Sequence, residues 1–120
     1  MSETICVINA HPHRDKSHLC HALADAYKAG AKAAGHKVRI LSLADMDVTF
    51  LRDPEDFQKP PPSADMLKAQ KAINDATHVV VIYPLWMGTM PALMKSFFEQ
   101  LSRNDFVVKT SEDGWPLKMM

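Results

Sequence analysis

The chain has 120 residues, which is the length of a single domain covering residues 1–120. Apolar residues make up 47% of it and charged residues 23%, and 14 Lys and Arg residues balance 14 Asp and Glu residues. This balance leaves no basic surface for a nucleic acid or an anionic membrane, and no apolar run is long enough to span a bilayer. The two cysteines form no CxxC pair and follow no signal-peptide pattern, so we expect a reduced, cytoplasmic protein.

The first half of the chain predicts a strand, a helix and a second strand. Ile5–Ile8 is a short apolar run that suits a strand buried on both faces. Helical spacing follows over residues 17–34, with Ser17 as the predicted N-cap and Gly35 as the residue just beyond the helix. The predicted inner stripe of this helix is Leu19, Ala22, Leu23, Ala26, Gly30 and Ala33. The second strand is expected at Lys37–Leu43.

The second half predicts a long connection, a helix, a strand and a last helix. Residues 45–63 contain several prolines and little periodicity, which favours a surface connection, and Ser63 then caps a helix. The most apolar strand is Val79–Tyr83, and Thr89 is the predicted cap of a helix with Pro91 in its first turn. The predicted inner face of the helix after Ser63 is Met66, Ala69, Ile73 and Ala76. That of the last helix is Leu93, Met94, Phe97, Phe98 and Leu101.

This β-α-β-α-β-α order predicts an α/β fold, with a parallel sheet and helices on both of its faces. In such a sheet, ligands bind beyond the carboxyl ends of the strands, where the strand order reverses. For the order 2-1-3, that place is flanked by residues 9–18 and 84–89. After Arg103 the pattern fades, because Phe106–Val108 is too short to assign and Asp113–Pro116 is typical of a turn.

The loop at residues 9–18 leads into a helix N-terminus, where free N–H groups and the helix dipole favour a phosphate. Ser17 offers a hydroxyl, and His11, Arg14 and Lys16 offer further donors or positive charge. The loop contains no glycine, so it matches neither the GxGxxG fingerprint nor the Walker A loop. The residues therefore predict a phosphate held by a longer loop with help from side chains.

The loop after the third strand places Trp86 between Leu85 and Met87, followed by Gly88 for close backbone approach. A flat aromatic with apolar neighbours suits a planar ring system, and backbone groups of such a loop can bind the polar edge of an isoalloxazine. The alternative is that Trp86 and Met87 simply pack at the top of the sheet.

Four histidines, at positions 11, 13, 18 and 21, also raise the question of a metal site. Zinc needs four convergent ligands, usually including cysteine or carboxylate, so we expect no metal and exposed or phosphate-contacting histidines instead. Cys20 lies in the first helical turn, where its pKa would be lowered, although a small buried residue is the favoured interpretation.

Five segments together resemble the flavodoxin-like NAD(P)H:quinone oxidoreductase family, which includes bacterial quinone reductases and potassium-efflux ancillary reductases. The segments are Val7–Pro12, Ser17-His18, Tyr83–Trp86, Pro91–Lys95 and Asp113–Leu117. The resemblance implies an FMN or FAD site. Its phosphate side would be His11, Ser17, His18, Leu19 and Cys20, and its ring side Pro84, Leu85, Trp86, Met87 and Gly88. Family members often carry an asparagine at the position of Cys20.

The resemblance further implies a homodimeric flavoenzyme that takes hydride from NAD(P)H and reduces quinones or similar acceptors in a ping-pong cycle. Family members continue with a fourth and a fifth strand, so at roughly 30 residues per βα unit we expect about 60–70 residues to be missing. The third strand would then be an exposed apolar edge. A truncated, non-catalytic domain that binds a partner is the alternative. A receiver-like module is disfavoured, because Asn9 and Tyr83 place no acidic cluster at the strand ends.

Overall fold

A three-stranded parallel sheet in the order β2-β1-β3 forms the centre of the computed structural model. The strands are β1 (Thr4–Asn9), β2 (Lys37–Ser42) and β3 (His78–Ile82). The structure describes residues 2–58, 62–103, 108–110 and 116–118. The predicted α/β class and strand order are therefore confirmed, and the predicted strand ends lie within one residue of the observed ones.

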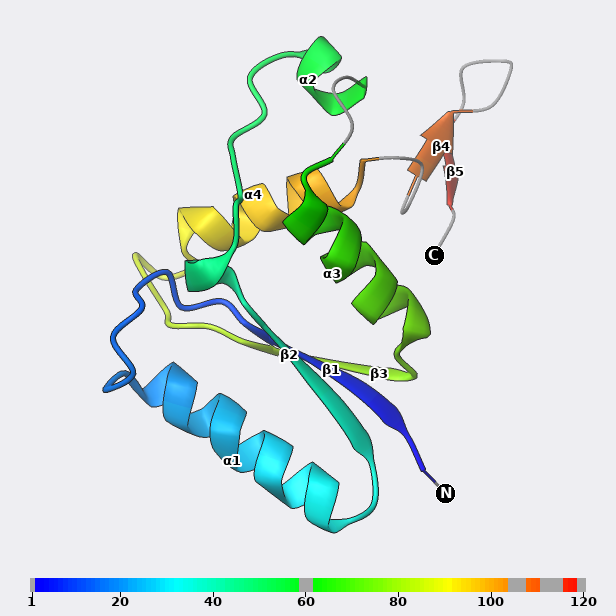
Figure 1. Cartoon of the computed structure of the whole chain (residues 1–120). Coiled ribbons are helices and arrows are strands. Elements are labelled where there is room, and N and C mark those ends of the chain that lie inside the picture. The colour runs from blue at the N-terminus through cyan, green and yellow to red at the C-terminus, as the bar shows by residue number, and fades with distance from the viewer. Residues whose placement is uncertain (1, 59–61, 104–107, 111–115, 119–120) are drawn as a thin grey trace.

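Helices cover both faces of this sheet, as predicted. α1 (Leu19–Ala33) lies on one face, and α3 (Ala64–Asp75) and α4 (Ala92–Leu101) lie on the other (Figure 1). The smaller elements are η1 (Leu43–Asp45), α2 (Pro54–Gln58) and an antiparallel hairpin of β4 (Val108–Thr110) and β5 (Pro116–Lys118). The turn expected at residues 113–116 lies mostly outside the described residues, but Pro116 begins β5. None of the described helices is both long enough and apolar enough to cross a membrane.

Two apolar clusters hold the layers together, and β1 contributes to both because successive strand residues point to opposite faces. The smaller cluster, under α1, has Ile5, Val7 and Ala24 as its buried members. The larger cluster lies under α3 and α4, and its buried members are Cys6, Ile8, Ala10, Leu43, Met66, Ala69, Ala72, Ile73, Met94, Phe97 and Leu101. The predicted inner faces of α3 and α4 are confirmed, with Ala76, Leu93 and Phe98 only partly buried.

The predicted inner stripe of α1 is wrong. Leu19 and Leu23 are 70% and 47% exposed, whereas His21 and Ala24 are buried. The helix is rotated in this way because the His21 ring hydrogen-bonds the Asn9 side chain at the end of β1. A buried polar contact with another element, rather than apolar periodicity, therefore sets which face of α1 meets the sheet.

The helix ends are partly as predicted. The Ser63 Oγ accepts a hydrogen bond from the Met66 N–H at 3.2 Å and caps α3. Thr89 does not cap α4; Pro91 is the N-cap residue, because Thr89 is held in a backbone pair with Trp86. β3 forms an edge of the described sheet, where the Val79 and Val81 side chains are 40% and 37% exposed, as expected for an apolar edge strand.

One short helix, α2, interrupts the connection expected over residues 45–63. The Asp53 Oδ1 accepts from the Asp56 N–H at 3.0 Å, and the Asp56 Oδ2 accepts from the Arg52 N–H at 2.7 Å. Asp53 followed by Pro54 has the residue types of an N-cap and first helical position. The signal for this helix was therefore present in the sequence.

Gly35 ends α1 as predicted, and its conformation leads to a stability prediction. Its φ is +89°, its N–H donates to the Lys32 carbonyl at 3.0 Å, and the His36 N–H donates to the Ala31 carbonyl at 3.0 Å, which is a Schellman ending.

We expect Gly35→Ala to lower the free energy of unfolding by about 1–2 kcal/mol, because a Cβ is strained at positive φ. Gly30→Ala is the matched control inside α1, where no atom lies within 4 Å of an added Cβ. It should instead add about 0.5–1 kcal/mol of stability. Urea denaturation measures both, and equal effects of the two variants would contradict this account of the helix end.

Candidate active site

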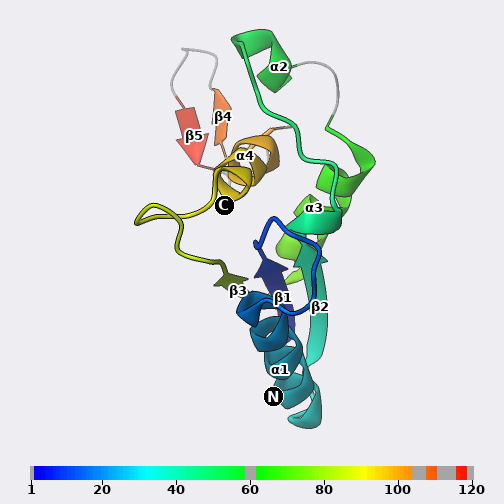
Figure 2. The ribbon, with the colours of Figure 1, turned by 90° about the vertical axis from the view of Figure 1, so that its left-hand side faces the viewer.

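The loops that follow β1 and β3 meet at the carboxyl end of the sheet, shown in blue and yellow-green in Figure 1. The Ala10 N–H donates to the Ile82 carbonyl at 2.8 Å and extends the β1–β3 pairing into the loops. The His11 and Trp86 rings then contact edge to face, with centroids 5.8 Å apart. The structure thus brings together one residue from each of the two loops that the sequence singles out. Figure 2 shows the loop after β3 projecting beyond the helices.

Behind the β1 loop lies a buried pair of polar side chains, Asn9 and His21, each 3% exposed. The Asn9 Oδ1 accepts from the His11 N–H at 3.3 Å, so the Asn9 Nδ2 is the group that donates to the His21 Nδ1 at 2.7 Å. The His21 Nε2 therefore carries the ring proton and donates to the His13 carbonyl at 2.9 Å. This network fixes the orientation of the His21 ring and the path of the loop between β1 and α1.

His11 lies at the meeting point of the loops, with most of its side chain buried. Its ring is 6% exposed, stacks on the His18 ring at 4.0 Å between centroids, and accepts the His13 N–H on Nδ1 at 3.1 Å. Neutral His11 consequently carries its proton on Nε2, and no described residue accepts that proton. Burial, and after it the neighbouring histidines, lower the pKa of His11 below its usual value.

The N-terminus of α1 adds further donors at this place. Its N-cap residue is His18, whose side chain makes no capping hydrogen bond. The N–H groups of Leu19 and Cys20 have no acceptor among the described residues, while those of His21 and Ala22 both reach the His18 carbonyl. Free N–H groups at a helix start, next to a ring N–H, form a site suited to an anion.

Ser17 and Arg14 are directed elsewhere. The Ser17 N–H donates to the Asp15 Oδ1 at 2.9 Å, and this contact with Ser17 holds the pKa of the Asp15 carboxyl below its usual value. The predicted N-cap role of Ser17 is therefore wrong, because His18 occupies that position. Arg14 donates to the Ala44 carbonyl and pairs with Asp45 of η1 at 3.4 Å, an exposed contact that draws the loop toward η1.

The loop after β3 folds into a tight turn with an exposed apolar surface. Trp86 and Thr89 exchange both backbone hydrogen bonds, at 2.8 and 3.0 Å, and Met87 and Gly88 between them have φ values of +50° and +79°. Positive φ at both central residues is the signature of a type I′ turn. Leu85, Trp86 and Met87 are 71%, 45% and 100% exposed, so Met87 does not pack on the described sheet, whereas the Trp86 ring is partly covered and contacts His11. An added Cβ at Gly88 would meet no described atom within 4 Å, so space does not require a glycine there. The positive φ of the turn is what favours it.

Comparison with known proteins agrees with this geometry. A family described as a flavodoxin-like fold matches residues 3–119. The chain belongs to the flavodoxin-like fold family. The resemblance predicted from the sequence is therefore confirmed at the level of the family.

Three known proteins are similar to this chain. NAD(P)H dehydrogenase [quinone] 1 of Cavia porcellus is 29% identical over 115 residues, covering 78% of this chain and 42% of that protein. The NAD(P)H:quinone oxidoreductase from Methanothermobacter marburgensis superposes with a TM-score of 0.74 at 23% identity, covering 90% of this chain and 57% of that one. An FMN-dependent NADH-azoreductase from Bacillus anthracis, in complex with FMN, has a TM-score of 0.66 at 16% identity, covering 95% and 61%. The chain thus spans about half the length of these relatives.

Asn9 and His21 also shape the site of this flavodoxin-like chain, although neither was among the predicted site residues. His21 lies three residues after His18, on a neighbouring position of one helical face, and this spacing was its only signal in the sequence. Asn9 is the polar residue that ends an otherwise apolar strand. The sequence contains both residues but does not show that they pair.

Cys20 contributes a backbone N–H to the helix start rather than a reactive thiol. Its side chain is buried, and burial raises its pKa, so the lowered pKa considered from the sequence is wrong. Burial likewise raises the pKa of the Cys6 thiol to about 11. Across the described part of the flavodoxin-like chain, no group of three or more His, Cys, Asp or Glu residues is placed to hold a metal.

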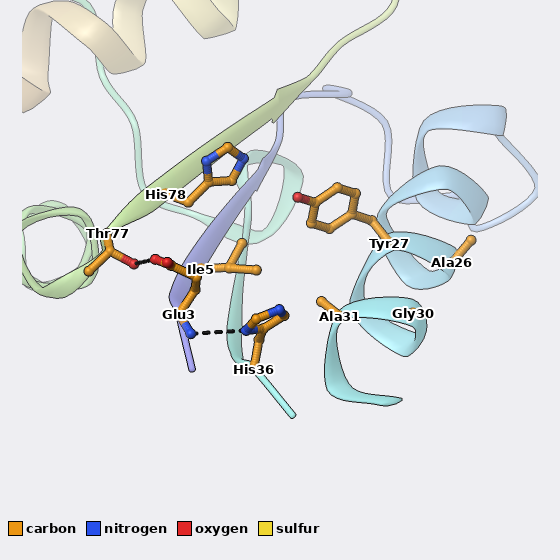
Figure 3. A pocket seen from close by; sticks show the side chains of 9 residues that line it. All are labelled: Glu3, Ile5, Ala26, Tyr27, Gly30, Ala31, His36, Thr77 and His78. Carbon is orange, nitrogen blue, oxygen red and sulfur yellow. Dashed lines mark hydrogen bonds between the residues drawn. The ribbon is translucent and has the colours of Figure 1, made fainter. Parts of the chain in front are cut away.

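A hollow of about 640 Å³ lies at the opposite, amino-terminal end of the sheet, between α1 and the first residues of β1 and β3 (Figure 3). Three of its lining residues already bond one another. The Thr77 hydroxyl donates to the Glu3 carboxylate, and the Glu3 N–H donates to the His36 Nδ1 at 2.9 Å. Ligands of open parallel sheets bind at the carboxyl ends of the strands, so we assign the site to the two loops and not to this hollow.

Proposed function

We propose that this chain carries the phosphate side and one ring edge of a flavin site in an NAD(P)H-dependent oxidoreductase that reduces quinones or similar acceptors. The observation that carries the proposal is the juxtaposition of free donors at the start of α1 with the exposed Trp86 turn, joined by the His11–Trp86 contact. The names of the relatives, a quinone dehydrogenase and an FMN-dependent azoreductase, support it.

On the phosphate side, the backbone N–H groups of Leu19 and Cys20 and the Nε2–H of His11 would donate to the phosphate oxygens. His18 lies beside them through its stack on His11. The positive end of the α1 dipole favours the same anion. The donors are held in place before the ligand arrives, which lowers the ordering cost of binding.

On the ring side, residues 84–88 would supply backbone groups to the polar edge of the isoalloxazine and the Trp86 side chain as an apolar contact. A bound flavin supplies hydride transfer, accepting from NAD(P)H and then reducing the acceptor in a ping-pong cycle. The part of the chain itself is to anchor, orient and shield one edge of the ring. FMN and FAD share the phosphate and the ring, so both fit these residues.

The proposal extends to a cytoplasmic homodimer. Exposed apolar side chains of β3 and of the following turn favour an assembly over a monomer, because such groups are commonly covered by a partner. The second subunit would complete the pocket in which NAD(P)H and the acceptor take turns.

Flavin uptake tests the proposal. The purified chain is mixed with FMN or FAD and desalted, and we expect it to retain about one flavin per chain, with the two absorption bands of the bound ring. His11→Phe keeps the aromatic stack but removes the ring donor, so its flavin affinity should fall about tenfold.

His78→Phe is the matched control, because His78 is an exposed histidine at the hollow on the far end of the sheet. It should leave the affinity unchanged. A colourless protein that retains neither flavin would overturn the proposal for this chain and favour the non-catalytic, partner-binding alternative. A loss of binding in His78→Phe but not in His11→Phe would move the site to the hollow.

A further inference from the structure

Residues 49–58, which include α2, form a strap that runs past α4 and away from the sheet (Figure 1). Its residues are exposed, except for Leu51 and Asp56, which are partly buried. None of them belongs to either apolar cluster of the described residues, whereas Met46 and Val48, just before the strap, pack against the larger one. The apolar core that holds its neighbours therefore does not hold the strap.

A stripe of three buried polar side chains on α4 and the turn after it holds the strap instead. Ser96, Gln100 and Arg103 follow helical spacing and are 3%, 3% and 5% exposed. The Ser96 Oγ and the Gln100 Nε2 donate to the Thr49 carbonyl at 2.9 and 2.8 Å, and the Gln100 Nε2 also reaches the Thr49 Oγ1 at 3.0 Å. The Arg103 Nε donates to the Phe57 carbonyl at 3.1 Å, and its Nη1 to the Gln100 Oε1 at 2.9 Å. Among the described residues, each hydrogen bond that leaves the strap ends on this stripe.

A hollow of about 410 Å³ separates much of the strap from the stripe. Its lining includes Phe50 and Leu51 of the strap, and Gln100 and Arg103 of the stripe. Surfaces that enclose such a space lose the dispersion contacts that close packing would give them. The hydrogen bonds that remain contribute little on balance, because water replaces them when the two surfaces separate. The strap is consequently attached much less firmly than the helices are attached to the sheet.

We propose that the strap lifts from α4 as a unit while the sheet and its three long helices stay folded, and that the stripe is the latch that closes it. The strap turns at Val48, the last residue before it that packs against the core. Leu43 is buried, so η1 stays in place and keeps its contact with Arg14 of the β1 loop. Lifting thus uncovers the stripe, with its guanidinium, and leaves the proposed flavin site intact.

Limited proteolysis of the full chain with chymotrypsin tests this inference, because a protease needs a locally unfolded segment and this one cleaves after aromatic residues. Phe50 and Phe57 report on the strap, and Tyr27, inside α1, reports on unfolding of the core. Initial rates at each site are measured by mass spectrometry at several non-denaturing urea concentrations. We expect cleavage of the strap to be at least about tenfold faster than cleavage at Tyr27. It should also change little with urea, since lifting exposes little surface.

Two variants weaken the latch to different extents. Gln100→Leu removes the donor to Thr49 and the acceptor of the Arg103 guanidinium, so the rate of strap cleavage should rise at least about tenfold. Ser96→Ala removes a single hydrogen bond and disturbs folding less, and it should raise the same rate about threefold. Both rates follow the population of the lifted strap when closing is faster than cleavage.

Gln70→Leu is the matched control, because Gln70 is also a buried glutamine that donates to backbone carbonyls. Its Nε2 bonds the Leu101 and Arg103 carbonyls at 3.0 and 2.9 Å, at the end of α4 and not on the strap. Its loss destabilises the core, so cleavage at Tyr27 should become faster while cleavage of the strap keeps its rate.

The results that would overturn the inference are equally specific. Cleavage at Phe50 and Phe57 with the rate and the urea dependence of cleavage at Tyr27 would mean that the strap opens only when the whole chain unfolds. Strap cleavage that stays the same in Gln100→Leu and Ser96→Ala would mean that the stripe is not the latch.

Discussion

Replacing Phe97 with alanine should lower the free energy of unfolding by about 3–5 kcal/mol, the largest single effect we expect in this chain. The Phe97 ring is 0% exposed and lies in the cluster that joins α4 to α3 and β1. Truncation removes the apolar surface that the ring buries and leaves a cavity that the packed neighbours fill only in part. Because domains of this size are stable by only about 5–15 kcal/mol, the variant should be close to unfolding at 37 °C.

Urea and thermal denaturation of Phe97→Ala measure this loss, and Phe98→Ala is the matched control. Phe98 is the next residue of α4, with its ring centroid 5.7 Å from that of Phe97, but it is only partly buried against the same cluster. Its truncation should cost about 1–2 kcal/mol. Equal losses in the two variants would mean that Phe97 does not anchor α4 in the way the structure shows.

Replacing Asn9 with leucine should lower the free energy of unfolding by about 2–4 kcal/mol, because two buried groups lose their partners. The His11 N–H loses its acceptor and the His21 Nδ1 loses its donor. The loop between β1 and α1 then loses its side-chain anchor at the end of β1, and only the Ala10–Ile82 backbone bond remains there. The variant should consequently bind flavin more weakly, although Asn9 donates nothing to the ligand.

Asn74→Leu is the control for this substitution, since Asn74 lies exposed on α3, away from both loops. Surface changes of this kind stay within about 0.5 kcal/mol. Denaturation and flavin titration are measured on both variants. If Asn9→Leu matched Asn74→Leu in both measurements, the Asn9–His21 pair would not be the support of the loop.

Local patterns in the sequence were sufficient for the strands and for two of the three long helices. Ile5–Ile8 is uniformly apolar because β1 is buried on both faces, and Met66, Ala69 and Ile73 are spaced for one face of α3. Ser63 and Gly35 act at the helix ends through bonds to residues within five positions of them, which is why their roles were readable. The positions of the two functional loops followed from the strand order alone.

The site itself was decided by particular hydrogen bonds that the sequence pattern does not reveal, whether their partners lie near or far along the chain. The face that α1 turns to the sheet depends on the Asn9–His21 bond, and Thr89 lost its expected capping role to a backbone pair with Trp86. Which nitrogen of His11 carries the proton likewise depends on a neighbour that the folded loop supplies.

The sequence by itself determined the α/β fold, the strand order and the end of the sheet at which a flavin would bind, because apolar periodicity and element order are local properties of the chain. Only the tertiary structure decided which groups at that end are free to bind. A donor such as the His11 Nε2–H becomes available only when every other neighbour has been placed and none of them accepts it.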